Sequence, residues 1–122
     1  MKKLIFLFSL FIAFQAVAQE GIRFRHCSWE EAKAMAKKEK KPIFIDFYTQ
    51  WCGPCLNMAE NIFTLGSVGN FYNDHFVCLK IDAETGEGVE LAKKYEVASF
   101  PTFVFVNPKT EKAIHISGSN QD

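Results

Sequence analysis

Two cysteines, Cys52 and Cys55, flank a Gly-Pro dipeptide just beyond the end of an apolar run. The run, residues 42–48, is apolar on both alternating faces except at Asp46, which is typical of a central strand covered on both sides. Pro54 suits the first turn of a helix, which we expect to continue to about residue 64. The sequence therefore predicts that the two thiols lie at a junction between a buried strand and a helix.

The position of the two thiols at the start of a helix predicts that they differ in reactivity. Free backbone N–H groups and the positive end of the helix dipole favour a thiolate, so we expect the pKa of Cys52 to lie below its usual value of about 8.5. An exposed Cys52 would attack a substrate disulfide, and a shielded Cys55, one helical turn away, would resolve the mixed disulfide.

Two other interpretations of the cysteine pair stay open. It resembles half of a structural zinc site, but zinc needs four ligands and the chain has no second C-x-x-C pair. A static disulfide is the other interpretation. It would stabilise the fold only weakly, because so short a loop removes little chain entropy from the unfolded state.

The rest of the chain alternates between strand and helix patterns. Ser28 and Glu31 form a capping box before an amphipathic stretch that stops at Pro42, which predicts one helix. We expect strands at 22–25, 42–48 and 76–81, helices at 29–40, 54–64, 67–72 and 89–95, and a hairpin of strands at 103–106 and 112–116. The prediction is one α/β domain with a central mixed sheet flanked by helices, in the order β-α-β-α-β-α-β-β.

Three motifs in this order resemble the thioredoxin superfamily. They are the pentapeptide from Trp51 to Cys55, the buried Asp46 six residues before Cys52, and a Ser-Phe-Pro-Thr loop at 99–102 that matches the family's cis-proline loop. The resemblance covers residues 29–116. It is closest to small secreted thioredoxin-like proteins and to the periplasmic C-terminal domain of transmembrane disulfide reductases, and it implies a thioredoxin fold.

The resemblance also implies roles for single residues. Burial is expected to raise the pKa of Asp46, which in this family relays a proton to or from the resolving cysteine, here Cys55. An aspartate on a solvated strand end is the alternative. Phe100 and Trp51 are expected to contact substrate. The residues expected to support the active site are Trp51, Gly53, Pro54 and Pro101.

The chain departs from the family at Cys78, which stands where thioredoxins often carry a lysine that pairs with the buried aspartate. Nothing in the local sequence replaces that lysine. We expect Cys78 and Cys27 to be unpaired, with a disulfide between them as the alternative. The histidines, His26, His75 and His115, are scattered and are expected to face solvent, so no metal site is predicted.

The first eighteen residues have the pattern of a secretory signal peptide. Two lysines precede an apolar run at 4–14, and small residues follow at the spacing of a cleavage site. A helix of that length covers about 16 Å, too short for a bilayer of about 30 Å, so an uncleaved anchor is the weaker alternative. We therefore expect a signal peptide at 1–18 and a thioredoxin-like domain at 19–122, located in the periplasm without stable membrane insertion.

These features predict an exported thiol–disulfide oxidoreductase that reduces protein disulfides. The Gly-Pro dipeptide resembles thioredoxin, whose potential is about −270 mV, more than it resembles strong oxidants. The expected partners are disulfide-containing exported proteins and a membrane disulfide reductase as electron donor. With 14 basic and 14 acidic residues, the chain has no charge excess to attract nucleic acid, and it carries no nucleotide or flavin motif, so no cofactor is expected. A disulfide oxidase or isomerase and a non-catalytic binding or chaperone module are the alternatives.

The end of the chain carries one more expectation. A thioredoxin domain has a further helix after the hairpin, on the sheet face of the active-site helix, and the polar residues 117–122 cannot supply it. We expect apolar strand surface to be exposed on that face. Either the sequence is a truncated form of a longer protein, or a partner or second copy covers the face and the protein self-associates.

Overall fold

A four-stranded mixed sheet in the order β2-β1-β3-β4 forms the centre of the molecule. The computed structural model describes residues 20–119, so the predicted signal peptide lies outside the described residues. β1 is parallel to β2 and antiparallel to β3, and β3 is antiparallel to β4. The elements are α1 (Trp29–Glu39), β1 (Ile43–Tyr48), α2 (Gly53–Asn61), α3 (Gly66–His75), β2 (Val77–Asp82), α4 (Glu87–Lys94), β3 (Thr102–Val106) and β4 (Ala113–Gly118). The predicted α/β class and mixed sheet are confirmed.

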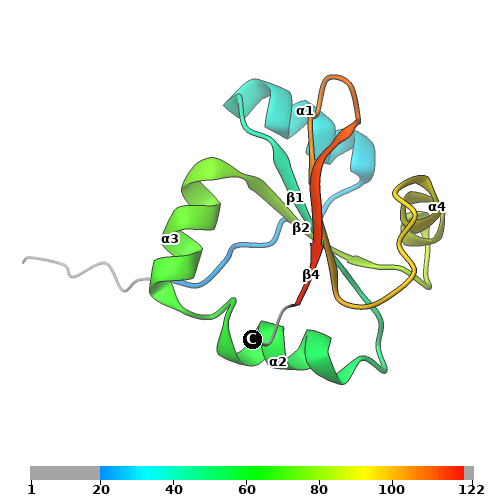
Figure 1. The fold of residues 1–122 in the computed structure, drawn as a ribbon. Helices are drawn as coiled ribbons and strands as arrows, with labels where there is room; N and C mark the ends of the chain where they lie inside the picture. Colours follow the sequence, from blue (N-terminus) through cyan, green and yellow to red (C-terminus); the bar gives the residue numbers. More distant parts are fainter. Residues whose placement is uncertain (1–19, 120–122) are drawn as a thin grey trace, which may run out of the picture.

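Helices cover both faces of the sheet, with α1 and α4 on one side and α2 and α3 on the other (Figure 1). The alternation of β1 divides the core accordingly. Ile43, Ile45 and Phe47 pack among residues of α1 and α4, whereas Phe44 packs in a second cluster with Phe63. Because successive side chains of a strand alternate, Asp46 lies on the same face as Phe44, beneath α2 and α3.

The ends of α1 follow from its sequence. The Ser28 side chain accepts a hydrogen bond from the N–H of Glu31 at 3.2 Å, as the capping box predicts. Lys40 ends the helix in the left-handed conformation, with φ of 56°, and Pro42 follows. Ala32 and Ala36 are fully buried against the sheet, so their small side chains let the helix approach it closely.

The predicted first strand is wrong in extent, because residues 22–25 form only a single parallel bridge, between Phe24 and Cys78. The N–H of Ile22 donates to a carbonyl of the loop after α2, and that of Arg23 donates to the side chain of Asn73 on α3. Backbone donors that bond to different elements cannot form a ladder with one strand. The observed element order therefore begins with α1.

This first segment crosses the helices at two glycines. A Cβ atom on Gly69 would lie 2.1 Å from the carbonyl oxygen of Glu20, and one on Gly21 would lie 2.3 Å from that of Phe63. Only glycine permits so close an approach of two backbones. The predicted helix at 67–72 is the longer α3, and the predicted helix at 54–64 ends at Asn61, so α2 and α3 both cover this face.

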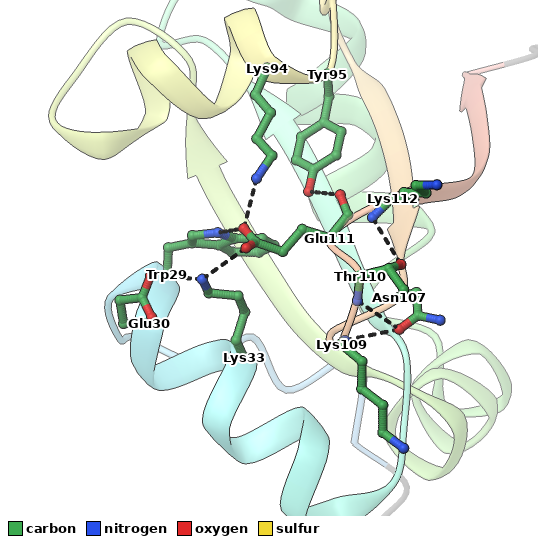
Figure 2. Close-up of polar contacts among 10 residues, drawn as sticks. All are labelled: Trp29, Glu30, Lys33, Lys94, Tyr95, Asn107, Lys109, Thr110, Glu111 and Lys112. Atoms are coloured by element: carbon green, nitrogen blue, oxygen red, sulfur yellow. Dashed lines mark hydrogen bonds and ion pairs between the residues drawn. The ribbon is translucent and has the colours of Figure 1, made fainter.

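Glu111, in the turn between β3 and β4, joins three elements on the other face (Figure 2). Its carboxylate accepts hydrogen bonds from Trp29 Nε1 at 3.0 Å and Lys94 Nζ at 2.7 Å, and Lys33 Nζ lies 3.4 Å away. Its backbone carbonyl accepts from the Tyr95 hydroxyl at 2.8 Å. The hydrogen bond from Lys94, followed by that from Trp29, lowers the pKa of Glu111 to about 2. The turn is thereby fastened to α1 and α4.

The expectation of bare apolar strand surface beneath a missing helix needs correction. Among the described residues, the large exposed apolar side chains on strands are Ile114 and Ile116 of β4. Ile116 pairs with Val104, which belongs to the core beneath α1 and α4, so the exposed surface lies on the opposite face from the one predicted. On the predicted face, Phe105 is half-buried because the aromatic cluster extends to it. Among residues 20–119, no helix combines the length and the apolar composition that a membrane span requires.

Candidate active site

Cys52 and Cys55 form a disulfide at the start of α2, with their Cα atoms 5.3 Å apart. Cys52 is the N-cap residue, and its sulfur accepts a hydrogen bond from the N–H of Cys55 at 3.1 Å. Pro54 occupies the first turn, where its missing N–H costs nothing. The predicted junction of strand and helix is therefore present, and the backbone N–H groups of the first turn point toward Cys52.

The two sulfur-bearing residues are almost equally shielded in the disulfide form. Cys52 is 7% exposed and Cys55 is 5% exposed, so the expectation of an exposed Cys52 is wrong for this state. The difference between them is their position in the helix. Cys52 caps the N-terminus, whereas Cys55 lies inside the first turn and faces the body of the protein. The helix terminus therefore favours Cys52 as the residue that carries a thiolate.

The predicted substrate-contact residues lie side by side. Trp51 is 71% exposed, and its ring meets that of Phe100 edge-on with centroids 6.1 Å apart. The Phe100–Pro101 peptide bond is cis, as the resemblance implies. Pro101 is buried immediately before β3, and the Thr102 hydroxyl donates to the carbonyl of Ser99 at 2.6 Å, which fixes this loop. An aromatic pair, with Trp51 exposed and Phe100 half-buried, is thus formed by the residue that precedes Cys52 and the residue that precedes Pro101.

Sequence reasoning missed Glu84, whose carboxylate accepts a hydrogen bond from Trp51 Nε1. Glu84 follows β2 in a loop whose backbone is held by Asp82, since Asp82 Oδ1 accepts from the Glu84 N–H at 2.9 Å. Nothing in the local sequence marks Glu84, because only the parallel pairing of β1 with β2 brings this loop to Trp51. The contact orients the indole ring at the rim of the site.

Asp46 is 1% exposed, and its Oδ1 has no hydrogen-bond partner among the described residues. Burial raises its pKa from 3.8 to about 6, and the positive charge of Lys80 partly opposes this shift. The solvated strand end is therefore excluded. A carboxyl group with this pKa exchanges its proton near neutral pH, as a proton relay requires.

The expectation that no positive charge compensates the Asp46 carboxylate is wrong, because Lys80 lies opposite it. The parallel register places Lys80 directly opposite Asp46, and the Lys80 ammonium lies 4.9 Å from the ring centroid of Tyr48. Lys80 also lines a hollow of about 310 Å³ together with both cysteines, Tyr48 and Ala59 of α2. The lysine expected at position 78 is thus replaced by one two residues further along the same strand face.

The remaining cysteines are free and lie apart. Cys27 packs against the core beneath α1 and α4, and Cys78 is buried in the aromatic cluster on the other face of the sheet. Burial raises the pKa of Cys78 to about 12, so this thiol is unreactive at neutral pH. His26, His75 and His115 are exposed, as predicted, and within residues 20–119 no three potential ligand side chains gather at a metal site.

Comparison with known proteins identifies the family to which this chain belongs. The model of the thioredoxin-like family matches residues 24–108. Thioredoxin-1 of Drosophila melanogaster is 42% identical over 74 residues, which are 61% of this chain and 64% of that protein. The chloroplastic thioredoxin-like protein CITRX of Arabidopsis thaliana is 31% identical over 82% of this chain and 53% of its own length. The chain thus spans less than two thirds of these curated relatives.

Solved structures show the same relationship. A proposed disulphide isomerase from Bacteroides thetaiotaomicron is 42% identical, with a TM-score of 0.74 and 84% of each chain covered. A thioredoxin from Thermus thermophilus is 27% identical, with a TM-score of 0.69, covering 80% of this chain and 75% of that one. The chain belongs to the thioredoxin-like disulfide oxidoreductase family, and its structure holds a Cys52–Cys55 disulfide at the start of α2.

Proposed function

We propose that this protein is an exported protein-disulfide reductase that uses the Cys52–Cys55 couple. The observation that carries the proposal is the disulfide at the N-terminus of α2, the helix that covers the sheet face on which Asp46 is buried with its Oδ1 unpartnered. A disulfide that only stabilises the fold would not require a buried carboxyl group such as Asp46. Burying that group costs stability, and such costs are typical of functional sites.

In the proposed reaction, the protein begins as a dithiol. The Cys52 thiol first releases its proton to water. Its thiolate attacks one sulfur of a substrate disulfide, and the other substrate sulfur leaves as a thiolate and takes up a proton from water. Asp46 then accepts the proton of the Cys55 thiol through water, and the Cys55 thiolate attacks the Cys52 sulfur of the mixed disulfide. The second substrate sulfur leaves and takes up the proton from Asp46. Two electrons have passed from the protein to its substrate, which ends as a dithiol.

Trp51 and Phe100 provide the surface on which a substrate chain would rest. Trp51 directly precedes Cys52 in the chain, its ring meets that of Phe100 edge-on, and Glu84 accepts a hydrogen bond from its indole. An extended substrate segment that lies along the residues before Pro101 would bring its disulfide to Cys52. Gly53 and Pro54 form the first turn of α2, and a Cβ atom on Gly53 would meet nothing within 4 Å, so the surface beside Cys52 is uncrowded at this position.

The proposal includes the direction of electron flow and the compartment in which the protein acts. The Gly-Pro dipeptide between the cysteines favours a reducing couple, and the signal-peptide pattern of residues 1–18 favours export. A reductase in the periplasm needs electrons from outside that compartment, and we propose that a membrane disulfide reductase supplies them. Disulfide isomerisation is the second candidate, because a solved relative with 42% identity is a proposed disulphide isomerase.

The redox potential of the Cys52–Cys55 couple, measured against glutathione, tests the direction. A value near −270 mV, with rapid reduction of insulin disulfides, supports the reductase, whereas a value near −180 mV with refolding of scrambled ribonuclease supports the isomerase. Cys52→Ser abolishes both activities, and Cys55→Ser accumulates mixed disulfides with substrates. Cys27→Ser is the matched control and retains full activity. Fusion of residues 1–18 to a reporter enzyme, followed by cell fractionation, tests export.

A further inference from the structure

A second surface lies at the end of the sheet opposite the disulfide. It comprises the outer edge of β4 and a hollow of about 460 Å³ between the end of α1 and the turn that joins β3 to β4. Figure 1 shows this turn beside α1, with α2 at the opposite end of the sheet. The disulfide chemistry uses no residue of this surface.

The edge of β4 offers backbone hydrogen bonds to a further strand. β4 is the last strand of the sheet, and no described segment pairs with its outer side. Natural edge strands are usually protected by a covering element or by inward-pointing charges, because an open edge readily pairs with another chain. Instead of charges, β4 carries Ile114, 62% exposed, and Ile116, 49% exposed. These isoleucines follow each other at the spacing of one strand face.

The hollow beside this edge is positively charged. Lys37, Lys40, Lys41 and Lys109 line it, and no acidic residue does. Lys41 is engaged elsewhere, since it donates to the carbonyl of Asn73 at 3.0 Å and lies 3.8 Å from Glu39. Within residues 20–119, no carboxylate lies within 4.0 Å of the other three ammonium groups. Three uncompensated positive charges thus surround one concave site.

The floor of the hollow is apolar. Ile114, Pro42 and Pro108 contribute to it, so an apolar side chain can enter while an acidic group two residues along the same strand face meets the lysines. A strand added to β4 would project alternate side chains onto the face of Ile114. We propose that β4 and this lysine-lined hollow bind an extended acidic segment of another polypeptide by strand addition, with apolar and acidic residues both present in that segment.

The observations favour this occupant over two others. The β4 strand of a second copy, Ala113–Gly118, contains no carboxylate and would leave the lysines without counter-charges. An anionic membrane surface would satisfy the lysines but has no strand to pair with the open edge. An extended chain with acidic and apolar residues can pair with the open edge, pack on the apolar floor and neutralise the lysines.

The test is a binding titration with a fluorescein-labelled peptide of sequence Glu-Thr-Val-Thr-Glu-Thr-Val-Thr-Glu, in which acidic and apolar residues share one strand face. Fluorescence anisotropy with the purified, oxidised protein at low salt is expected to show saturable binding. Weakening by about tenfold or more is expected in the double variant Lys37→Glu and Lys40→Glu and in Ile114→Thr. Lys38→Glu reverses a neighbouring charge on α1 that does not line the hollow, and it is expected to bind within about twofold of the wild type.

Two peptide controls separate the contributions. The same peptide with lysine in place of glutamate is expected not to bind, and a version with alternate N-methylated residues, which cannot form edge hydrogen bonds, is expected to bind at least tenfold more weakly. All protein variants are expected to unfold cooperatively and to retain insulin reduction, since none of these residues belongs to the disulfide site. Failure of the reductase proposal would therefore leave this one unaffected.

Several outcomes would overturn the proposal. They are no binding of the acidic peptide at millimolar concentration, equal binding of the lysine peptide, and unchanged affinity in the double lysine variant. Dimerisation in sedimentation experiments that Ile114→Thr abolishes, without peptide binding, would assign the edge to a second copy. Binding to phosphatidylglycerol vesicles but not to the peptide would assign the lysines to a membrane surface.

Discussion

Replacement of Asp46 by asparagine should change how the stability of the protein depends on pH. The carboxyl group is 1% exposed, and burial raises its pKa from 3.8 to about 6. Well below pH 3.8 the group is protonated in both the native and the unfolded state. As the pH rises from there through 6, the unfolded chain releases the proton first, so the free energy of unfolding falls.

The size of the effect follows from the two pKa values. At about 1.36 kcal/mol per pH unit, a rise from 3.8 to about 6 corresponds to roughly 3 kcal/mol lost between pH 3.5 and pH 7.5. Asp46→Asn cannot lose this contribution, because an amide does not titrate. The buried amide has its own cost, which is the same at every pH. The difference between the free energies of unfolding of variant and wild type should therefore grow by roughly 3 kcal/mol in favour of the variant.

Urea unfolding of the oxidised proteins at several pH values provides the measurement, since the disulfide removes two cysteines from the titration. Asp74→Asn, at an exposed position of α3, is the matched control and should follow the wild type at every pH. If the wild-type and Asp46→Asn curves run parallel across this range, Asp46 does not carry a raised pKa and the proposed proton relay is refuted.

Three further predictions concern other residues. Glu111→Gln should destabilise the protein by about 1 kcal/mol at pH 7, a value reduced because the side chain is one-third exposed. Since the pKa of Glu111 is lowered to about 2, urea unfolding should show this difference in full above pH 4.5 and shrinking as the pH falls toward 2. Lys80→Met should raise the pKa of Asp46 further, because the opposing charge is lost, and carboxyl ¹³C chemical shifts during titration would report it; an unchanged midpoint would contradict the pairing. In the reduced protein, brief alkylation at mildly acidic pH followed by peptide mapping should label Cys52 before Cys55, and the reverse order would contradict the assignment of the nucleophile.

Part of the active site could be predicted from the sequence because local chemistry determines it. An apolar run before Cys52 and a proline after it suffice for a strand followed by a helix, and the spacing of the two cysteines brings their Cα atoms to 5.3 Å once that helix forms. The capping box at Ser28 likewise sets the start of α1. The nature of Asp46 was also predictable, because a lone carboxyl group in a run that is apolar on both faces is buried wherever the strand lies in the sheet.

The surroundings of these residues depend on strand register, which the sequence does not specify locally. Lys80 compensates Asp46 only because β1 and β2 pair in one parallel register, and a shift by one residue would turn it to the other face. The same pairing brings Glu84 to Trp51. Sequence spacing also left open whether Cys27 and Cys78 pair, and the sheet that separates them decides that they do not.

The failure of the first predicted strand has the same cause. Residues 22–25 alternate as a strand should, yet their backbone donors bond to a loop, to a side chain of α3 and to β2, because Gly21 and Gly69 let the segment cross the helices closely. Local propensity and hydrophobic pattern thus determined where the helices and central strands form and which two cysteines lie at the start of a helix. Contacts between residues distant in sequence decided the charge opposite Asp46, the partner of Trp51 and the open edge of β4, since each depends on pairing and packing that only the complete fold provides.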